Sequence, residues 1–359
     1  MAINLANKYS DKIAQHFAQT SFIKGMTSNE YDFVGVKSLK IYTLATVAMN
    51  DYNRNASANR YGEPSEIQDT FQELVMKRDR SFVGVIDKGN DAEQMGVKNA
   101  MRWLRIQMDE KVTPESDKYA FSQFIMNAGK VAAIEEALDK DNVVGHLAKA
   151  MAYLDDKGVP YVGRTIYINT STYSMLRQAP EFIGVDKLGE KALSKGVVGE
   201  FMGAKVVRVP NAYLANGTYF LITYKESVMF PWKISDTKLH EDPPGINGAQ
   251  IEGRFNYDAF VLGAKADGVY VGADAAYALN APEITCSAPG TSDMVISCED
   301  AQTILYTIDG SDPRYSPDVL TYSGAVSTAD WAGDVTVKAV GYKQGKQTSD
   351  VTEVTYTVG

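Results

Sequence analysis

The sequence predicts an α+β fold that continues into a small C-terminal β-sandwich. Three observations lead to this prediction. Alternating strand patterns lie between residues 39 and 87, an apolar helical stripe runs through 91–128, and residues 281–359 contain several short strands without a helical pattern. The chain has 359 residues, of which 45% are hydrophobic and 23% charged, so it can bury a sizeable core.

The first 38 residues predict an extended or partly helical N-terminal arm. They are polar and carry isolated aromatic anchors at Phe17, Phe22 and Phe33. This N-terminus lacks the apolar core of a signal peptide, and the longest nearly apolar run of the chain is about half as long as a membrane helix. We therefore expect a protein made in a cytoplasm and without membrane contact.

Residues 39–90 predict a long two-stranded hairpin with a flexible tip. The first strand alternates from Leu39 to Met49, the second covers 69–87, and the segment between them is polar and rich in turn residues. Such a hairpin is marginal on its own, so it needs a partner surface. The charge-rich run in the second strand suits ion pairs between subunits, and a solvated strand face is the alternative; this run is Lys77, Arg78, Asp79 and Arg80.

Residues 91–140 predict the main helical region. Asn90 and Glu93 fit a capping box, and an apolar stripe follows from Val97 to Met108. The run "KVTPES" interrupts this pattern, and Thr113 with Pro114 restarts the helix. The helical element is expected to span about 91–128.

Residues 141–280 alternate helices and strands, and we divide them into 141–222 and a returning part, 223–280. A helix is expected over 142–157. The runs "RTIYIN", "TYFLITY" and "SVMFPWKI" predict strands, and "TSTYSMLRQ" predicts a helix capped by Thr or Ser. The run "GEFMGAKVVRVPNAY" predicts a Gly turn and a strand that stops at Pro210, and "QIEGRFNYDAFVLGAKADGVYVG" predicts two strands joined through "AKADG".

Residues 281–359 form a compositionally separate unit after a linker that contains Pro282. They hold 11 acidic and 4 basic residues, whereas the rest of the chain holds 34 acidic and 32 basic ones. The nearly neutral body excludes the basic field of a dedicated nucleic-acid binder. Strand patterns at "TILYTI", "DVTVKAVGY" and "TEVTYTV" predict a small β-sandwich.

The turn after "TILYTI" contains Asp309, Gly310 and Asp312. Asp309-Gly310 predicts a hairpin-type turn in which Gly310 takes a positive φ. The two cysteines, Cys286 and Cys298, could face each other across a hairpin and bond, but a cytoplasmic origin favours free thiols.

The sequence offers little for catalysis or metal binding. His16 and His146 lie in helical patterns, and His240 lies in the expected loop "KLHEDPPG". Gly129-Lys130 resembles the end of a P-loop, but Val131 stands where Ser or Thr is needed, and the upstream glycine is missing. No nucleophile elbow, zinc-protease motif or dinucleotide fingerprint occurs. We expect no catalytic, cofactor or metal site, which favours a structural or binding role.

The order of the elements resembles the major capsid protein of tailed bacteriophages, which has the Hong Kong 97-type fold. "TVAMNDYNR" and "ELVMKRDRSFVGVIDKGNDAEQM" resemble the extended loop and its descent into the spine helix, and "VTPESDKYAFSQF" resembles the second part of that helix. "IYINTSTYSMLR" and "GVVGEFMGAKVVRVP" resemble the axial domain, and "GRFNYDAFVLGAKADGVY" resembles strands that return to the peripheral domain. The resemblance covers about residues 1–275.

The C-terminal unit resembles a different family, the immunoglobulin-like module at the C-terminus of chitobiases and β-hexosaminidases. The runs "ILYTIDGSDP", "YSGAV" and "VTVKAVGYKQGKQTS" carry this resemblance. The module is an accessory in hydrolases, so it does not imply catalysis.

The first resemblance implies a virion protein whose copies form hexamers and pentamers of an icosahedral head, assembled in the host bacterial cytoplasm around double-stranded DNA. It implies a portal as a partner, a separate protein for any scaffolding that is used, and no sequence-specific DNA contact. Some members cross-link through a lysine of the hairpin. Lys77 is the only lysine between 41 and 87, and no partner for it is identified, so we expect no cross-link.

Two other functions are consistent with the pattern. An encapsulin-type nanocompartment has the same fold but encloses protein cargo. A carbohydrate-binding adhesin would use the C-terminal module, whose only tryptophan is Trp331. For that module we expect an outer decoration without a defined ligand. Weak contact with host-surface glycans, or a stabilising cap over the capsomers, are the alternatives.

Overall fold

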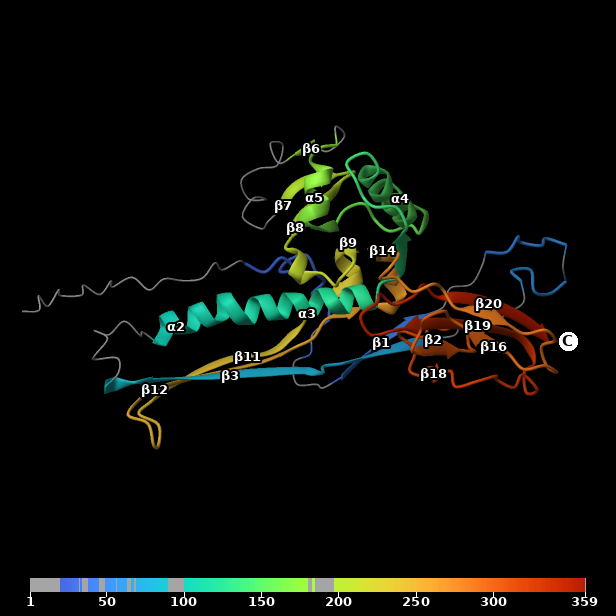
Figure 1. Cartoon of the computed structure of the whole chain (residues 1–359). Coiled ribbons are helices and arrows are strands. Elements are labelled where there is room, and N and C mark those ends of the chain that lie inside the picture. The colour runs from blue at the N-terminus through green and yellow to red at the C-terminus, as the bar shows by residue number, and fades with distance from the viewer. Residues whose placement is uncertain are drawn as a thin grey trace, which may run out of the picture.

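The structure is a computed structural model that describes residues 20–31, 33, 38–44, 49–55, 57–62, 66–67, 69–89, 100–179, 183–184 and 197–358. Figure 1 shows three parts. A long helical rod runs beside long strands, a lobe of sheet and helices sits above one end of the rod, and a β-rich C-terminal module lies beside that same end.

The hairpin consists of β1 (Ser38–Leu44) and β2 (Asp69–Val75), which pair in antiparallel register with Leu39 opposite Leu74. One face of the hairpin root packs in a small core that contains Phe33. The side chains on this face are Leu39, Ile41 and Leu74. The alternation expected from the sequence is therefore confirmed for the described part of the strand. Of the expected aromatic anchors, Phe22 and Phe33 are buried, and Phe17 lies outside the described residues.

The second half of the expected hairpin belongs to another sheet. β3 (Arg78–Asp87) pairs with β12 (Gly248–Tyr257), which pairs in turn with β11 (Trp232–Glu241). The expectation that 69–87 form one strand facing 39–49 is therefore wrong beyond Val75. The chain changes partner because β12 offers β3 a continuous antiparallel ladder, and such long-range pairing leaves no local pattern in the sequence.

The rod is one helical run made of α2 (Ala100–Gln107), the π-helical η1 (Met108–Val112) and α3 (Thr113–Met126). The expected interruption at "KVTPES" is thus a π-helical turn and not a break. Pro114 has no N–H to donate, and the irregular turn before it accommodates the missing bond. Asn90, Glu93 and Val97 lie outside the described residues. None of the residues of α2, which is described in full, is buried.

The lobe is built on a seven-stranded mixed sheet with the order β4-β14-β9-β5-β8-β7-β6. The strand β9 crosses the expected boundary at 222, and β4 and β14 join the same sheet, so the lobe draws on residues 130–274. Its strands are β4 (Lys130–Ile134), β5 (Arg164–Asn169), β6 (Ile183–Gly184), β7 (Val197–Phe201), β8 (Ala204–Val209), β9 (Thr218–Tyr224) and β14 (Val269–Asp274).

The two faces of this sheet contribute to two separate cores. Tyr167 and Leu221 pack with Phe121 and Phe124 of α3, whereas their neighbours along the strands pack against α4 (Val143–Asp156) and α5 (Thr170–Leu176). Because both faces are covered, β5, β9 and β14 are almost continuously buried. The helix expected over 142–157 and the strands "RTIYIN" and "TYFLITY" are confirmed.

Three local expectations need correction. The side chain of Asn169, not Thr or Ser, caps α5 by accepting a hydrogen bond from the Thr172 backbone N–H at 2.7 Å. The expected strand "SVMFPWKI" is split at Pro231 into β10 (Val228–Met229) and β11, because proline cannot donate to a ladder. His240 lies in β11 rather than in a loop.

The region after β12 also contains a third short strand, β13 (Phe260–Val261), which pairs with β10. Short 3₁₀ turns complete the body: η3 (Asn211–Tyr213), η4 (Lys225–Ser227) and η5 (Gly263–Gly268).

The C-terminal module has its own core, which includes Ile284, Met294, Val337 and Ala339. A two-stranded and a four-stranded sheet enclose it. Their strands are β15 (Glu283–Thr285), β16 (Val295–Ser297), β17 (Thr303–Thr307), β18 (Leu320–Thr321), β19 (Gly333–Tyr342) and β20 (Thr352–Val358).

The two cysteines of the module do not face each other. In the β15–β16 ladder Ile284 lies opposite Ile296, so Cys286 and Cys298 lie beyond opposite ends of the ladder. Both are free thiols, and burial raises the pKa of the Cys298 thiol. The expectation of free thiols is therefore confirmed.

Candidate assembly surface

The charge-rich run selected from the sequence lies where the hairpin joins the long sheet. The Lys77 backbone N–H donates to Asp258 Oδ2 at 2.8 Å. Arg78 Nη2 and Arg80 Nε lie 3.0 Å and 2.8 Å from the same oxygen, Glu115 Oε1 on α3. These contacts attach the start of β3 to the rod.

Asp79 makes the best-defined ion pair of this run. Its two carboxylate oxygens accept from Arg254 Nε at 3.1 Å and from Arg254 Nη2 at 2.6 Å. These hydrogen bonds lower the pKa of Asp79. Arg78, Asp79 and Arg80 therefore have partners within the subunit, and their role between subunits stays a prediction.

The hairpin beyond its root is the most exposed apolar part of the described chain. Met49 is fully exposed, and Tyr61 is 84% exposed. Tyr52 and Tyr61 form an edge-to-face pair with centroids 4.9 Å apart, so the tip is locally ordered by aromatic contact. Other exposed apolar side chains of the hairpin are Tyr42, Leu44 and Ile67. Exposed apolar groups on a marginal two-stranded element are typical of a surface that another molecule covers.

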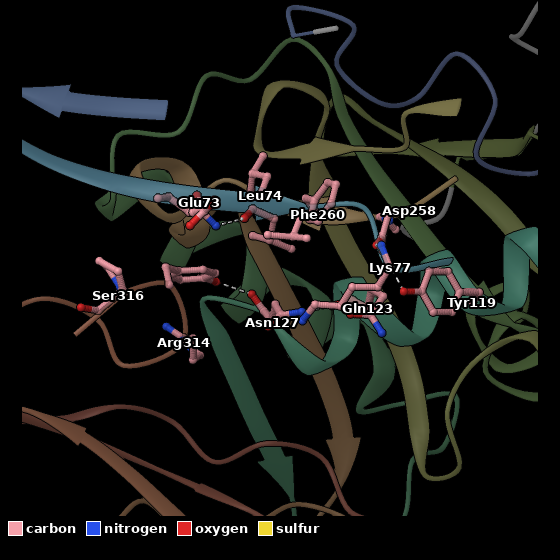
Figure 2. Close-up of a pocket in the computed structure, with 16 residues that line it drawn as sticks. Glu73, Leu74, Lys77, Tyr119, Gln123, Asn127, Asp258, Phe260, Arg314 and Ser316 are labelled. Atoms are coloured by element: carbon pink, nitrogen blue, oxygen red, sulfur yellow. Dashed lines mark hydrogen bonds between the residues drawn. The ribbon is translucent and has the colours of Figure 1, made fainter. Parts of the chain in front are cut away.

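A groove of about 520 Å³ lies beside the root of the hairpin. Figure 2 shows its walls: Glu73 and Leu74 come from β2, Gln123 from α3, Asn127 from the position directly after α3, and Arg314 from the C-terminal module. Most of these side chains are polar or charged. The groove is thus suited to polypeptide that offers hydrogen-bonding groups, and less suited to an apolar ligand.

One buried carboxylate organises the inner wall of the groove. Asp258 is 3% exposed, and its Oδ1 accepts from the Tyr119 hydroxyl at 2.8 Å, as the dashed line in Figure 2 marks, and from the Ala259 backbone N–H at 2.8 Å. Burial and the bond to Asp258 raise the pKa of Tyr119 above its ordinary range, so the hydroxyl stays a donor. Sequence inspection missed Asp258, because the pattern of a strand does not mark a buried acceptor.

The three turn residues of the module lie in a long loop between β17 and β18, and not in a tight hairpin turn as expected. Gly310 has φ = +76°, which confirms the expected left-handed conformation. Asp309 Oδ1 accepts from the Ser311 backbone N–H at 3.0 Å, and Asp312 pairs with Arg314 at 2.6 Å. The sequence pattern also did not predict that Arg314 and Tyr315, which directly follow this turn, contact the body.

The histidines do not form a reactive cluster in the described part of the chain. His240 Nε2 lies 3.4 Å from Glu252 Oε2 on the surface of the long sheet, His146 lies on α4, and His16 is not among the described residues. No group of three or more His, Cys, Asp or Glu side chains that could hold a metal ion occurs among the residues described. In the described ranges, no helix has the length and apolar character of a membrane span.

Comparison with known proteins separates the body from the module. The model of the Fn3-associated family matches residues 294–356, which agrees with the expected immunoglobulin-like module. No curated protein matches the chain.

Solved structures match about three quarters of the chain. A structure from Mycobacterium phage Che8 is 21% identical with a TM-score of 0.61, and the match covers 76% of this chain and 98% of that one. The capsid structure of cyanophage P-SCSP1u is 14% identical with a TM-score of 0.60 (76% and 93% covered), and the mature capsid of bacteriophage PhiM1 is 11% identical with a TM-score of 0.59 (75% and 91%). The body therefore has the phage capsid fold, as the sequence predicts.

Proposed function

We propose that this chain is the major capsid protein of a tailed bacteriophage. Copies form hexamers and pentamers, which close into an icosahedral head around double-stranded DNA. One observation supports this proposal above the others: the fold of the body matches capsid structures over more than nine tenths of their own chains. The role is structural rather than catalytic, and the protein works as part of a virion.

The hairpin supplies the main contact between subunits in this proposal. The β1–β2 root is fixed by its own core, whereas the tip exposes Met49, Tyr52 and Tyr61. Covering a large exposed apolar side chain contributes about 1.5–3 kcal/mol, so these three side chains together would stabilise a subunit contact appreciably. A tip that lies over a neighbouring subunit would bury this surface and stabilise the two-stranded element at the same time.

The charge distribution supports the placement of the parts. A nearly neutral body can line a wall that does not bind DNA tightly, since tight binding requires an excess of Lys and Arg. The module carries 11 acidic and 4 basic residues, and we place it on the outer face, where it does not repel packaged DNA. A portal is a further partner in this proposal.

The hairpin contact can be tested with tip variants. Met49→Ser, Tyr52→Ser and Tyr61→Ser, combined in one chain, should abolish or strongly reduce shell formation, because they remove the apolar surface of the tip. The subunit should stay folded by circular dichroism, since these side chains lie outside all the cores. Deleting residues 54–68 should have the same effect.

Leu320→Ser is the matched control. Leu320 is also an exposed apolar side chain, but it lies in the module. Shells should form normally from this variant. Normal shells from the triple variant would show that the tip is not the contact.

A further inference from the structure

The C-terminal module contacts the body through two segments. In Figure 1 the module lies against the end of α3 and beside β1 and β2. We call residues 312–317 the Arg314 loop and residues 346–350 the Asp350 segment. Both reach the joint formed by residues 127–131, where the rod ends and β4 of the lobe begins.

The Arg314 loop satisfies backbone carbonyls at the end of α3. Arg314 Nη1 donates to Ala128 O, and the Tyr315 hydroxyl donates to Asn127 O. Asn127 and Ala128 directly follow α3, so their carbonyls have no partner in the helical ladder and need donors from elsewhere. The Arg314 side chain is only 4% exposed, and its ion pair with Asp312 at 2.6 Å offsets the cost of burying its charge.

The Asp350 segment holds the first residues of β4. Asp350 Oδ1 accepts from the Val131 backbone N–H at 2.8 Å, and Oδ2 pairs with Lys130 Nζ. β4 is the edge strand of the seven-stranded sheet and pairs with β14 on one side. The carboxylate thus accepts the hydrogen bond of a backbone N–H on the side of β4 that faces away from β14.

A third contact in the same segment is fully enclosed. Gln347 is 3% exposed, and its Nε2 donates to Asn216 O at 3.0 Å and to Thr218 Oγ1 at 2.9 Å, at the start of β9. A buried amide that finds both partners in the body belongs to a specific interface and not to a flexible tether.

We propose that the module acts as an internal brace that fixes the joint between α3 and β4. The contacts join the ends of three elements at this joint: the end of the rod, the edge of the sheet and the start of β9. The folded module would therefore stabilise the joint, and weakening the module would also weaken the joint. An independently folding, tethered module would leave the joint unchanged when the module is weakened.

The proposal is tested by hydrogen exchange of the full-length chain, followed by mass spectrometry. The readout is the peptide that covers residues 127–134, and β5 in the middle of the lobe serves as the internal reference. Asp350→Ala should accelerate exchange in 127–134 by about tenfold or more, because it removes the charged acceptor of Val131. Exchange in β5 should be unchanged.

Asp334→Ala is the matched control. Asp334 lies in the same module and accepts from Thr357 Oγ1 at 2.7 Å within that module. It should leave exchange in 127–134 unchanged. A rate in Asp350→Ala that equals the wild-type rate would overturn the brace.

A second variant distinguishes a brace from a local contact. Val337 is fully buried in the core of the module and belongs to neither contacting segment. Val337→Ala should weaken the module and also accelerate exchange in 127–134. Acceleration confined to residues 281–358 would contradict the proposal. Neither outcome depends on shell assembly, so the test stands apart from that of the proposed function.

Discussion

Asp258 and Tyr119 form the central contact of the groove: the Tyr119 hydroxyl donates to Asp258 Oδ1 over 2.8 Å. The same carboxylate accepts from the backbone N–H groups of Lys77 and Ala259. One buried side chain therefore ties the rod, the start of β3 and the corner after β12.

Asp258→Ala should destabilise the subunit by about 3 kcal/mol, because three donors lose their one buried acceptor together. Tyr119→Phe removes only one donor and should cost about 1 kcal/mol. Denaturant unfolding of both variants measures the difference. Equal losses for the two variants would show that the backbone donors do not depend on Asp258.

Gly129 lies in the joint between α3 and β4, and a side chain there would meet fixed backbone. A Cβ on Gly129 would overlap the carbonyl of Ala266, which cannot move without disturbing η5. Gly129→Ala should therefore destabilise the body by about 2 kcal/mol or more, as overpacking does.

Gly145→Ala provides the control for this substitution. Gly145 lies in α4, and a Cβ there would meet no described atom within 4 Å. This change should be neutral or should stabilise the protein by up to about 1 kcal/mol. Thermal unfolding compares the two variants, and a similar loss in both would contradict the steric explanation.

Asp117 on α3 anchors the described start of the chain and should make that anchor depend on pH. Its carboxylate accepts from Ser21 Oγ at 2.7 Å and from the Phe22 backbone N–H at 2.8 Å. Burial raises the pKa of Asp117 above its ordinary value of 3.8, although these hydrogen bonds oppose the shift.

The sign of the pH dependence follows from the raised pKa. The folded state binds the proton more readily than the unfolded state, so the contribution of Asp117 is fully present below the unfolded pKa and falls as pH rises through the folded pKa. The stability lost in Asp117→Asn should therefore be larger at about pH 4 than at about pH 7. Urea midpoints at both pH values measure it, and a larger loss at neutral pH would reverse the assignment.

Gly310 offers a test inside the module. With φ = +76°, a β-branched residue there is strained regardless of the space around it. Gly310→Val should destabilise the module by about 1–2 kcal/mol, while the seven-stranded sheet stays folded. Proteolysis should then cut first within 281–359. Cleavage that begins in the lobe would contradict this prediction.

Removing the module after residue 280 should leave assembly intact, since the cores of the body lie almost wholly outside it. Microscopy should show shells that lack outer protrusions. If the brace holds, these shells should also open at a lower temperature than those of the full chain. Missing density on the inner face, or a complete loss of shells, would contradict the outer placement.

The sequence could predict the elements whose pattern is local. β5 and β9 were predictable because strands buried on both faces read as short runs rich in β-branched and aromatic residues, and α4 because burial of one helix face leaves a clear period. The change of sheet between Val75 and Arg78 could not be predicted, because the sequences of β2 and β3 have the pattern of one continuous strand. Only the ladder to β12 and the acceptor Asp258 separate them.

The candidate surface was predictable in part. The polar tip and the alternating strand pattern were enough to predict an exposed hairpin. The docking of the module on the body could not be predicted from the sequence. Arg314 and Ala128 are 186 residues apart, and a charged side chain in a loop is normally expected to be solvated. For the same reason the run from Lys77 to Arg80 gave no sign of its partners Glu115 and Arg254.

The central claim is that copies of this chain assemble by themselves into a container. Electron microscopy of the full-length protein, expressed alone and viewed over a range of concentrations and ionic strengths, tests it most directly. Closed shells, capsomers or tubes are the expected result. A well-behaved monomer under every condition would contradict it.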